Sequence, residues 1–355
     1  MMKRIFSKAL LGALLALVSL QVSAWTSPVP LPDLEAARLR IVGQNARNYL
    51  SDFTASNADV TTEADFQAKT NKMANVFLAL EADIVAICDV QEDDQILSYI
   101  VAEMNSLAQT NVYAYVTDGM SASQSASGYM PLKSGFIYRQ DKVTPYGSST
   151  SPYTSGTYKP RMRIQAFKEN ATNELFVLSM NHFKAKSSSV PDDTEETRLE
   201  NVSRLLTALN KVTTDPDILI MGDLNAYTDE APIQNLIQAG YAEQLVRFDA
   251  NAYSYIYKGT RGLLDHAMAN ASMAGQITDA ATYHINTSGS YSYRYSDHDA
   301  YVVAVCLGTQ NCGSGEGIED IQSAPRATKT IENGQLVLIL PDGTKYNVLG
   351  EVIKK

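Results

Sequence analysis

The chain has 355 residues and a formal net charge of −10, with 39 Asp and Glu against 29 Lys and Arg. This acidic total excludes binding of nucleic acid through a generally basic surface, although a locally basic groove remains compatible with it. Three cysteines are too few for a disulfide-rich fold, so the hydrophobic core must supply the stability. Cys306 and Cys312 could close a small loop in an oxidising compartment, whereas Cys88 lies in an apolar run and is predicted to be a buried hydrophobe.

The first 24 residues have the pattern of a secretory signal peptide. Lys3, Arg4 and Lys8 form a basic region before an apolar stretch at 9–20, and residues 22–24 fit a cleavage site. That stretch is too short to span a bilayer and no comparable run follows it, so no transmembrane segment is predicted. Removing the segment takes away three positive charges and no negative ones, which lowers the formal charge from −10 to about −13.

Apolar runs and helical periodicities follow one another without strict alternation along residues 25–307. Helices are predicted at 66–80, 95–107 and about 193–210, with a short one near Ile233. Strands are predicted at 39–42, 83–88, 112–116, 134–139, 163–168, 175–180 and 217–221, and around Leu264 and Tyr301. Segments 118–128 and 146–157 are rich in Ser, Thr and Gly and are predicted to be loops. This mixture favours an α+β sandwich over a doubly wound sheet.

The composition changes after Leu307. Residues 308–327 are rich in Gly, Ser, Gln and Glu, which predicts a linker. Residues 328–355 contain two strand-like runs on either side of a tight turn, which predicts a β-hairpin. The predicted organisation is a signal peptide at 1–24, one large domain at 25–307, the linker, and this C-terminal tail.

Polar motifs stand at the ends of several predicted strands. Asp223 and Asn225 directly follow one strand, where a carboxylate can contact a metal ion and an amide a phosphate oxygen; an Asx-rich turn is the structural alternative. His182 closes another strand, Asp265 interrupts an apolar one, and His298 precedes the last. A buried carboxylate is costly unless it is paired, and an imidazole is a suitable partner. Three of the four histidines fall in these motifs: His182, His266 beside Asp265, and His298. This clustering favours catalysis over a structural role.

In their order along the chain, these motifs resemble those of the endonuclease/exonuclease/phosphatase superfamily, the fold of pancreatic-type DNase and of abasic-site endonucleases. The resemblance spans roughly residues 37–307 and includes segments 44–48 and 87–90. Segments 222–227, 230–233 and 283–286 are similar to secreted bacterial nucleases. The resemblance implies a four-layer α/β/β/α sandwich of two mixed β-sheets. It also implies a bacterial protein that is secreted or stays in the periplasm or at the cell surface.

The resemblance implies a catalytic role for five residues. His298 would be the general base that activates water, with Asp265 orienting it. His182 would be the general acid or a transition-state stabiliser. Asp223 and Asn225 would contact the scissile phosphate or a second cation.

The resemblance also implies a Mg²⁺ or Mn²⁺ ion held by Asn45, Asp89 and Asp297, and oxygen-rich sites of this kind accept Ca²⁺ as well. Most members carry Glu where this chain has Asp89. The shorter side chain draws the carboxylate back by about 1.5 Å, so the cation would move, bind through water, or recruit Glu92. Three arginines are candidate phosphate contacts, with solvated surface arginines as the alternative for the last two: Arg47, Arg161 and Arg163.

The function implied is a divalent-metal-dependent phosphodiesterase, a nuclease that hydrolyses DNA, with RNA as an open alternative. Nucleic acid would be its partner as substrate, no stable protein partner is indicated, and a monomer is expected. The same fold could instead act on a phospholipid or inositol phosphate, with Tyr253, Tyr255 and Tyr257 imitating a lipid-binding hairpin, although their alternation fits an ordinary strand better. A non-catalytic binding protein is the third hypothesis. The C-terminal tail resembles β tails used for export or outer-membrane anchoring, or it is an accessory hairpin.

Overall fold

The computed structural model describes residues 25–308 apart from 122, 187–194, 213 and 289, and then residues 312, 328–332, 335–339 and 344–346. The signal peptide predicted at 1–24 lies outside the described residues, as does most of the predicted linker. The chain divides into two compact units, Met1–Asn311 and Cys312–Lys355. None of the helices in the described ranges is both long and apolar enough to cross a membrane.

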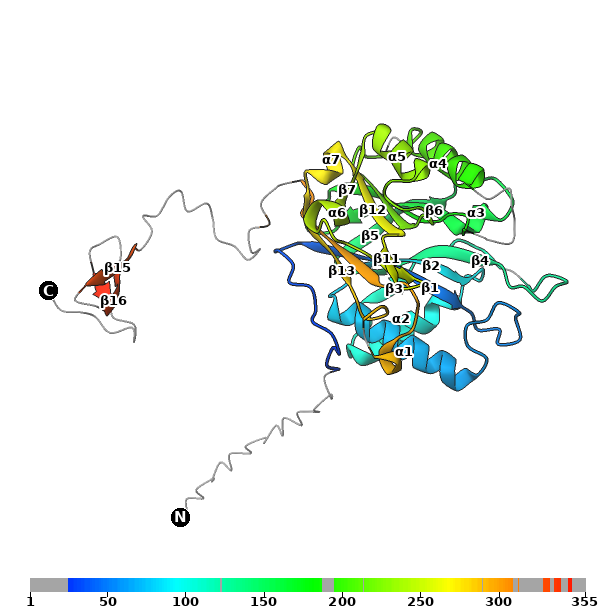
Figure 1. Ribbon diagram of the computed structural model, residues 1–355, viewed down its shortest axis with the longest axis horizontal. Coiled ribbons are helices and arrows are strands. Elements are labelled where there is room, and N and C mark those ends of the chain that lie inside the picture. The colour runs from blue at the N-terminus through cyan, green and yellow to red at the C-terminus, as the bar shows by residue number, and fades with distance from the viewer. Residues whose placement is uncertain are drawn as a thin grey trace, which may run out of the picture. The chain divides into compact units, whose positions relative to one another are not determined.

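Two six-stranded sheets form the centre of the first unit (Figure 1). The order of the first sheet is β13 (Ile277–Tyr283), β14 (Ala300–Val305), β1 (Leu39–Tyr49), β2 (Ile84–Gln91), β4 (Leu132–Arg139) and β3 (Tyr113–Tyr115). The order of the second is β5 (Val143–Thr150), β6 (Met162–Glu169), β7 (Leu175–His182), β8 (Ile218–Asp223), β12 (Asp265–Asn270) and β9 (Tyr241–Glu243). β1 runs parallel to β2 and β7 to β8, whereas their other neighbours are antiparallel, so both sheets are mixed.

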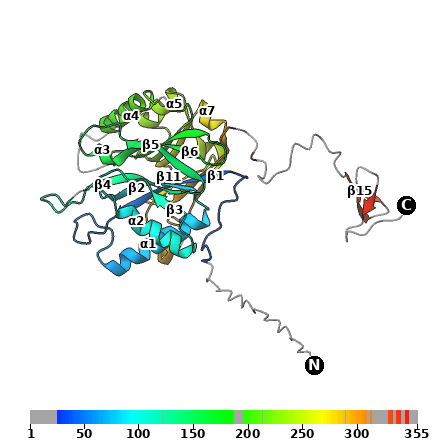
Figure 2. The same ribbon diagram turned by 180° about the vertical axis from the view of Figure 1, so that it is seen from behind.

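Helices cover the outer face of each sheet (Figures 1 and 2). On the first sheet lie α1 (Glu63–Ala79) and α2 (Ile96–Leu107), and Phe77 of α1 belongs to the same buried cluster as Val85 of β2. On the second sheet lie α4 (Glu195–Leu209) and α5 (Ala231–Gln238), and Leu205 of α4 shares a cluster with Ile220 of β8. The four layers confirm the predicted α/β/β/α sandwich.

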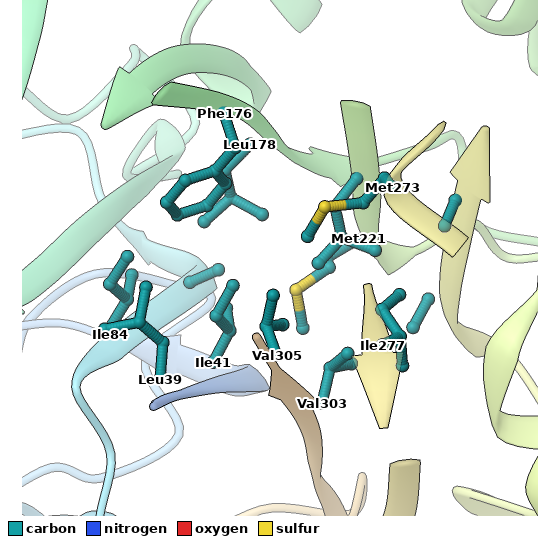
Figure 3. Close-up of a cluster of buried hydrophobic side chains, with 14 of the residues drawn as sticks. Leu39, Ile41, Ile84, Phe176, Leu178, Met221, Met273, Ile277, Val303 and Val305 are labelled. Carbon is teal, nitrogen blue, oxygen red and sulfur yellow. The ribbon is translucent and has the colours of Figure 1, made fainter. Parts of the chain in front are cut away.

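Apolar side chains alternate between the two faces of each central strand, as the pleat of a strand requires. In β1, Leu39 and Ile41 lie between the sheets, whereas Val42 faces the helices. Figure 3 shows Leu39 and Ile41 opposite Phe176 and Leu178 of the second sheet. Because both faces of the central strands are buried, their sequences are nearly continuous apolar runs.

The structure adds strands that the sequence did not predict. β5 extends to Thr150, so the loop predicted at 146–157 is wrong over its first five residues. β5 is an edge strand with largely exposed Ser and Thr, and its pairing with β6 overrides that loop-like composition. β13 was also missed, because its burial does not follow a period of two.

The second unit contains a three-stranded antiparallel sheet in the order β15 (Thr328–Glu332), β16 (Gln335–Ile339) and β17 (Lys345–Tyr346). β16 and β17 correspond to the hairpin expected from the sequence. β15 is a further strand that pairs with the other edge of β16.

Candidate active site

The polar motifs predicted from the sequence meet at one end of the two sheets. β7 and β8 are parallel, so their last residues, His182 and Asp223, lie side by side in register. Asp265 begins the antiparallel strand β12 directly opposite Asp223. His298 stands just before β14, which runs antiparallel to β1, where Asn45 is located. The strand register thus brings together residues that are far apart in the sequence.

These side chains surround a cavity of about 750 Å³, a volume typical of ligand sites. Most residues of the predicted site line it: Asn45, Arg47, Asp89, Arg161, His182, Asp223, Asn225, Asp297 and His298. Asp265 lies beneath the wall, fully buried, and reaches the cavity through His298. Arg163 does not reach the cavity.

The imidazole of His298 is held by Asp265, whose Oδ2 lies 2.7 Å from Nδ1. Nε2 is 3.8 Å from the Oδ2 atom of Asp223. Burial by itself would lower the pKa of His298, but the carboxylates of Asp265, Asp223 and Asp297 raise it to about 10. The protein groups alone therefore favour the imidazolium. A cation among these carboxylates would weaken their attraction for the proton and favour the neutral base.

Both oxygens of Asp223 accept hydrogen bonds. Asn45 donates from Nδ2 to Oδ2 at 2.9 Å, and the backbone N–H of Asn225 donates to Oδ1 at 2.9 Å. Burial raises the pKa of Asp223, against the attraction of His298. The Nδ2 atom of Asn225 donates to the carbonyl of Phe183 at 3.2 Å, which fixes the amide at the cavity wall.

His182 lies next to Asp89, with 3.3 Å between Nδ1 and Oδ1. The other carboxylate oxygen of Asp89 accepts the backbone N–H of Asn48 at 3.0 Å. Burial would raise the pKa of Asp89, but His182 and the Asn48 hydrogen bond lower it to about 2. The Asp89 carboxylate is therefore ionised at neutral pH and available to a cation or to an imidazolium.

Unusual backbone conformations gather around the cavity. Arg47, Asn48, Asp89 and Asn225 all have positive φ, between 47° and 62°, which is uncommon for residues other than glycine. The pairing register shifts between Asn45 and Tyr49, and again between β2 and β4 beyond Ile87. Such bulges redirect side chains next to functional sites. No sequence pattern predicted them.

The three predicted arginines have different environments. Arg47 lies with its Nε 3.0 Å from Asp59 and 3.9 Å from Asp297. Arg161 lines the cavity and donates from Nη2 to the hydroxyl of Tyr129 at 2.7 Å. Arg163 is one residue inside β6, buried, and donates from Nε to Ser149 of the neighbouring strand at 3.2 Å. Its place in the strand, rather than at the strand end, keeps it from the cavity.

The structure adds residues that sequence reasoning missed. Aromatic and cationic side chains complete the cavity wall: Tyr129, Lys186, Tyr227, Tyr255 and Tyr257. Tyr255 and Tyr257 belong to β10 (Tyr255–Tyr257), which forms a hairpin with β11 (Thr260–Gly262). The ring of Tyr255 lies 4.7 Å from that of His298, centroid to centroid. The alternation of tyrosines was a usable signal: the sequence offered a lipid-binding hairpin there as an alternative to the better-fitting ordinary strand, but it did not place these rings beside His298.

The backbone of the His298 loop is held by Asn286. Its Nδ2 donates to the carbonyl of His298 at 2.7 Å, and its Oδ1 accepts the N–H of Tyr295 at 3.0 Å. Asp299, which is fully buried, accepts the N–H of Asn286 at 2.9 Å and lies 2.9 Å from Nδ1 of His284. Segment 283–286 therefore positions the loop that carries His298.

Solved structures share this architecture. An endonuclease/exonuclease/phosphatase from Bacteroides vulgatus superposes with a TM-score of 0.55 at 13% identity, over 76% of this chain and 98% of that one. A mannosyl-6-phosphatase from Bacteroides thetaiotaomicron gives 0.55 at 13% identity, over 76% and 100%. The fold is DNase I-like. TDP2 from D. rerio, complexed with single-strand DNA product, has this DNase I-like fold at a TM-score of 0.51 and 15% identity, over 75% and 97%. No protein-family model and no curated protein sequence matches the chain.

The residues at this end of the DNase I-like sandwich suit a hard divalent cation. Asp223 and Asp265 offer carboxylate oxygens that lie within 4.8 Å of each other and of the His298 ring. Oδ1 of Asp265 is buried and has no hydrogen-bond partner among the described residues, so it is free to face a positive charge. The residues predicted as metal ligands, Asn45, Asp89 and Asp297, line the same cavity. Carboxylate and amide oxygens are the ligand types that Mg²⁺ and Mn²⁺ prefer.

Proposed function

We propose that this protein is a divalent-metal-dependent phosphodiesterase that hydrolyses DNA, with RNA as the alternative polynucleotide substrate. The observation that carries the proposal is the pairing of His298 with Asp265 at 2.7 Å in one cavity with Asp223, Asn225 and His182. This arrangement supplies a base, an orienting carboxylate, phosphate contacts and an opposing imidazole, which are the parts that in-line attack of water on a phosphodiester needs.

In the proposed mechanism, Nε2 of His298 takes a proton from the attacking water while Asp265 holds Nδ1. The new P–O bond forms as the bond to the leaving oxygen breaks, and His182 donates a proton to that oxygen or stabilises its charge. Asn225 and Arg161 donate hydrogen bonds to the phosphate oxygens as negative charge builds there. A bound Mg²⁺ or Mn²⁺ would supply further positive charge at these oxygens.

Two observations support a polynucleotide over a lipid substrate. Tyr255 and Tyr257 line the catalytic cavity, where aromatic rings can stack on bases. TDP2, a structure with the same fold, is described in complex with a single-strand DNA product. The mannosyl-6-phosphatase on this fold motivates a phosphomonoesterase as the competing activity.

The test is incubation of the purified protein with plasmid in the presence of Mg²⁺, Mn²⁺, Ca²⁺ or EDTA, beside His298→Ala. We expect cleavage with Mg²⁺ or Mn²⁺, none with EDTA, and a rate about 10²–10⁴-fold lower for the variant, the usual contribution of a general base. Intact plasmid under every metal, at a loading where a known nuclease digests it, would contradict the proposal. Release of inorganic phosphate from a phosphomonoester, or of phosphocholine from a phospholipid, without DNA cleavage would support the competing activities.

We also propose that the protein is exported from a bacterium, to the medium, periplasm or cell surface, and acts as a monomer. The signal-peptide pattern supports export, as do the disulfide-bonded states of Cys306 and Cys312. Fractionation of expressing cells tests this location. Recovery of the uncleaved chain from the cytoplasm alone would contradict it.

A further inference from the structure

A second cavity, of about 690 Å³, adjoins the catalytic one. Arg47 and Asp297 line both cavities. The second cavity is otherwise formed by the segment before α1, the first turns of α1, the middle residue of β10 and the loop that leads to His298, and its wall includes Asp59, Asp65, Lys69, Lys72, Ile256 and Arg294. The two cavities together are large enough for a ligand that extends beyond a single phosphate group.

The strand β10 lies between the two cavities. Tyr255 and Tyr257 line the catalytic cavity, whereas Ile256, between them, lines the second one. This follows from the alternation of side chains along a strand. Arg47 lies where the two cavities meet. Its Nε is 3.0 Å from Oδ1 of Asp59 and 3.9 Å from Oδ1 of Asp297, and half of its side chain is exposed. A ligand that occupied both cavities would pass this guanidinium.

The second cavity has a local excess of positive charge in a chain whose net charge is −10. Its four cationic side chains, Arg47, Lys69, Lys72 and Arg294, outnumber its three carboxylates. Lys69 is buried and its ammonium group is bound within the protein, because Nζ donates to Asp59 at 2.7 Å and to the carbonyl of Arg47 at 2.8 Å. Lys72 is half-buried and Arg294 is exposed, and the two are adjacent, since Nζ of Lys72 donates to the backbone carbonyl of Arg294 at 3.2 Å. Nη2 of Arg294 donates to the carbonyl of Thr287 at 3.3 Å.

We propose that the second cavity binds the phosphate next to the scissile one in a polynucleotide strand, through Lys72, Arg294 and Arg47. The inference rests on the proposed function and narrows its substrate to a chain with at least two consecutive phosphates. A phosphomonoester or a phospholipid headgroup with one phosphate has no second anion to place there. Asn286 and Thr287 add polar groups to this wall beside Lys72 and Arg294.

The test compares two substrates with the double variant Lys72→Ala/Arg294→Ala. Bis(p-nitrophenyl) phosphate is a single phosphodiester without a neighbouring phosphate, and a short single-stranded oligonucleotide has one on each side. We expect kcat/KM to fall at least about tenfold more on the oligonucleotide than on the small ester, because a charge-assisted contact contributes roughly that factor. The control is Lys142→Ala/Lys211→Ala, which removes the same charge from exposed positions that line neither cavity.

A binding measurement separates this role from damage to folding. In a His298→Ala background, the oligonucleotide affinity is measured against salt concentration, with and without the Lys72→Ala/Arg294→Ala pair. Each lost phosphate contact reduces the slope of log K on log salt by about 0.7 for a single strand, and one contact is lost here, so we expect the slope to become shallower by about 0.7. The control pair should leave the slope unchanged.

Equal losses on both substrates, or a salt slope matching that of the control pair, would overturn the second cavity as a phosphate site while leaving the nuclease proposal intact. If the unaltered protein cleaves bis(p-nitrophenyl) phosphate but no oligonucleotide, the polynucleotide function fails, and this inference fails with it. If the unaltered protein cleaves both and the variant loses only the oligonucleotide, the inference stands.

Discussion

Asp89 is the position at which the sequence departs from the pattern of the superfamily it resembles. In the structure its backbone adopts a φ of 62°, beside the shift in pairing of β2. That conformation turns the short side chain toward the cavity, where the carboxylate lies 3.3 Å from His182. The shorter side chain therefore still lines the site, and its charge is available there at neutral pH.

Asp89→Asn keeps the shape of the side chain and removes its charge. We expect the metal concentration for half-maximal phosphodiester cleavage to rise at least about tenfold, because cation affinity depends on the number of charged ligands. Titration of Mn²⁺ and Mg²⁺ with bis(p-nitrophenyl) phosphate as substrate measures this. A lower kcat at saturating metal, with the metal requirement unchanged, would instead assign Asp89 to the orientation of His182 alone.

At the scale of elements, the approach of β1 to β14 depends on Gly43. Gly43 pairs with Tyr301, and a Cβ atom on Gly43 would lie 2.0 Å from Cζ of the Tyr301 ring. Tyr301 is fully buried between the sheets, so its ring cannot move aside. The contact matters for function because β14 follows directly after His298.

Gly43→Ala is expected to lower the free energy of unfolding by at least about 2 kcal/mol, the range for overpacking a closed core. Urea denaturation of the variant measures the loss. The double variant Gly43→Ala/Tyr301→Val should lose less than the sum of the two single variants, because the smaller side chain removes the overlap. Additive losses would show that the ring and the new methyl group do not meet.

A buried carboxyl at the start of β2 makes stability depend on pH. Asp83 accepts the N–H of Arg40 at 2.9 Å and lies 3.6 Å from Arg139. Burial raises the pKa of Asp83 to about 6, above the value of about 3.9 in an unfolded chain. The folded state therefore binds more protons than the unfolded state between these two values, and its stability falls as pH rises through this interval.

We expect the free energy of unfolding to fall by up to about 3 kcal/mol more in the unaltered protein than in Asp83→Asn as pH rises from about 4 to about 6. The Asn side chain retains an oxygen that can accept the Arg40 hydrogen bond. Urea denaturation of both proteins across this interval gives the difference. Parallel pH profiles would contradict the raised pKa.

At the scale of the whole molecule, the first compact unit, Met1–Asn311, contains its own buried hydrophobic clusters, which include side chains of both six-stranded sheets. The second unit, Cys312–Lys355, has its own small sheet. We therefore propose that the large domain folds without the tail.

A chain that ends after Cys312 should keep its Tm within about 3 °C of the full chain and retain the cleavage activity of the full chain. Calorimetry and the plasmid assay measure both, with the full chain as the control. A larger fall in Tm, or loss of activity with Tm unchanged, would assign the tail a role in the large domain.

The sequence by itself determined the layered architecture and most of the candidate site. Nearly continuous apolar runs mark the central strands, and the polar residue at the end of a run belongs to the site, as at His182 and Asp223. Such signals are local in the sequence, because the residue that follows a strand lies at the edge of the sheet whichever strands are its neighbours. The pairing of His298 with Asp265 also agrees with the expectation that a buried carboxylate needs a partner.

Only the tertiary structure decided which groups face the cavity and what lies beside it. Arg161 reaches the cavity and Arg163 does not, because Arg161 ends α3 (Tyr158–Arg161) whereas Arg163 lies within β6 and donates to Ser149 of the neighbouring strand. The positive φ of Asp89 and the position of β10 between the two cavities likewise depend on contacts between segments distant in sequence. Strand pairing, bulges and cavities are long-range properties, which no local pattern of residues specifies.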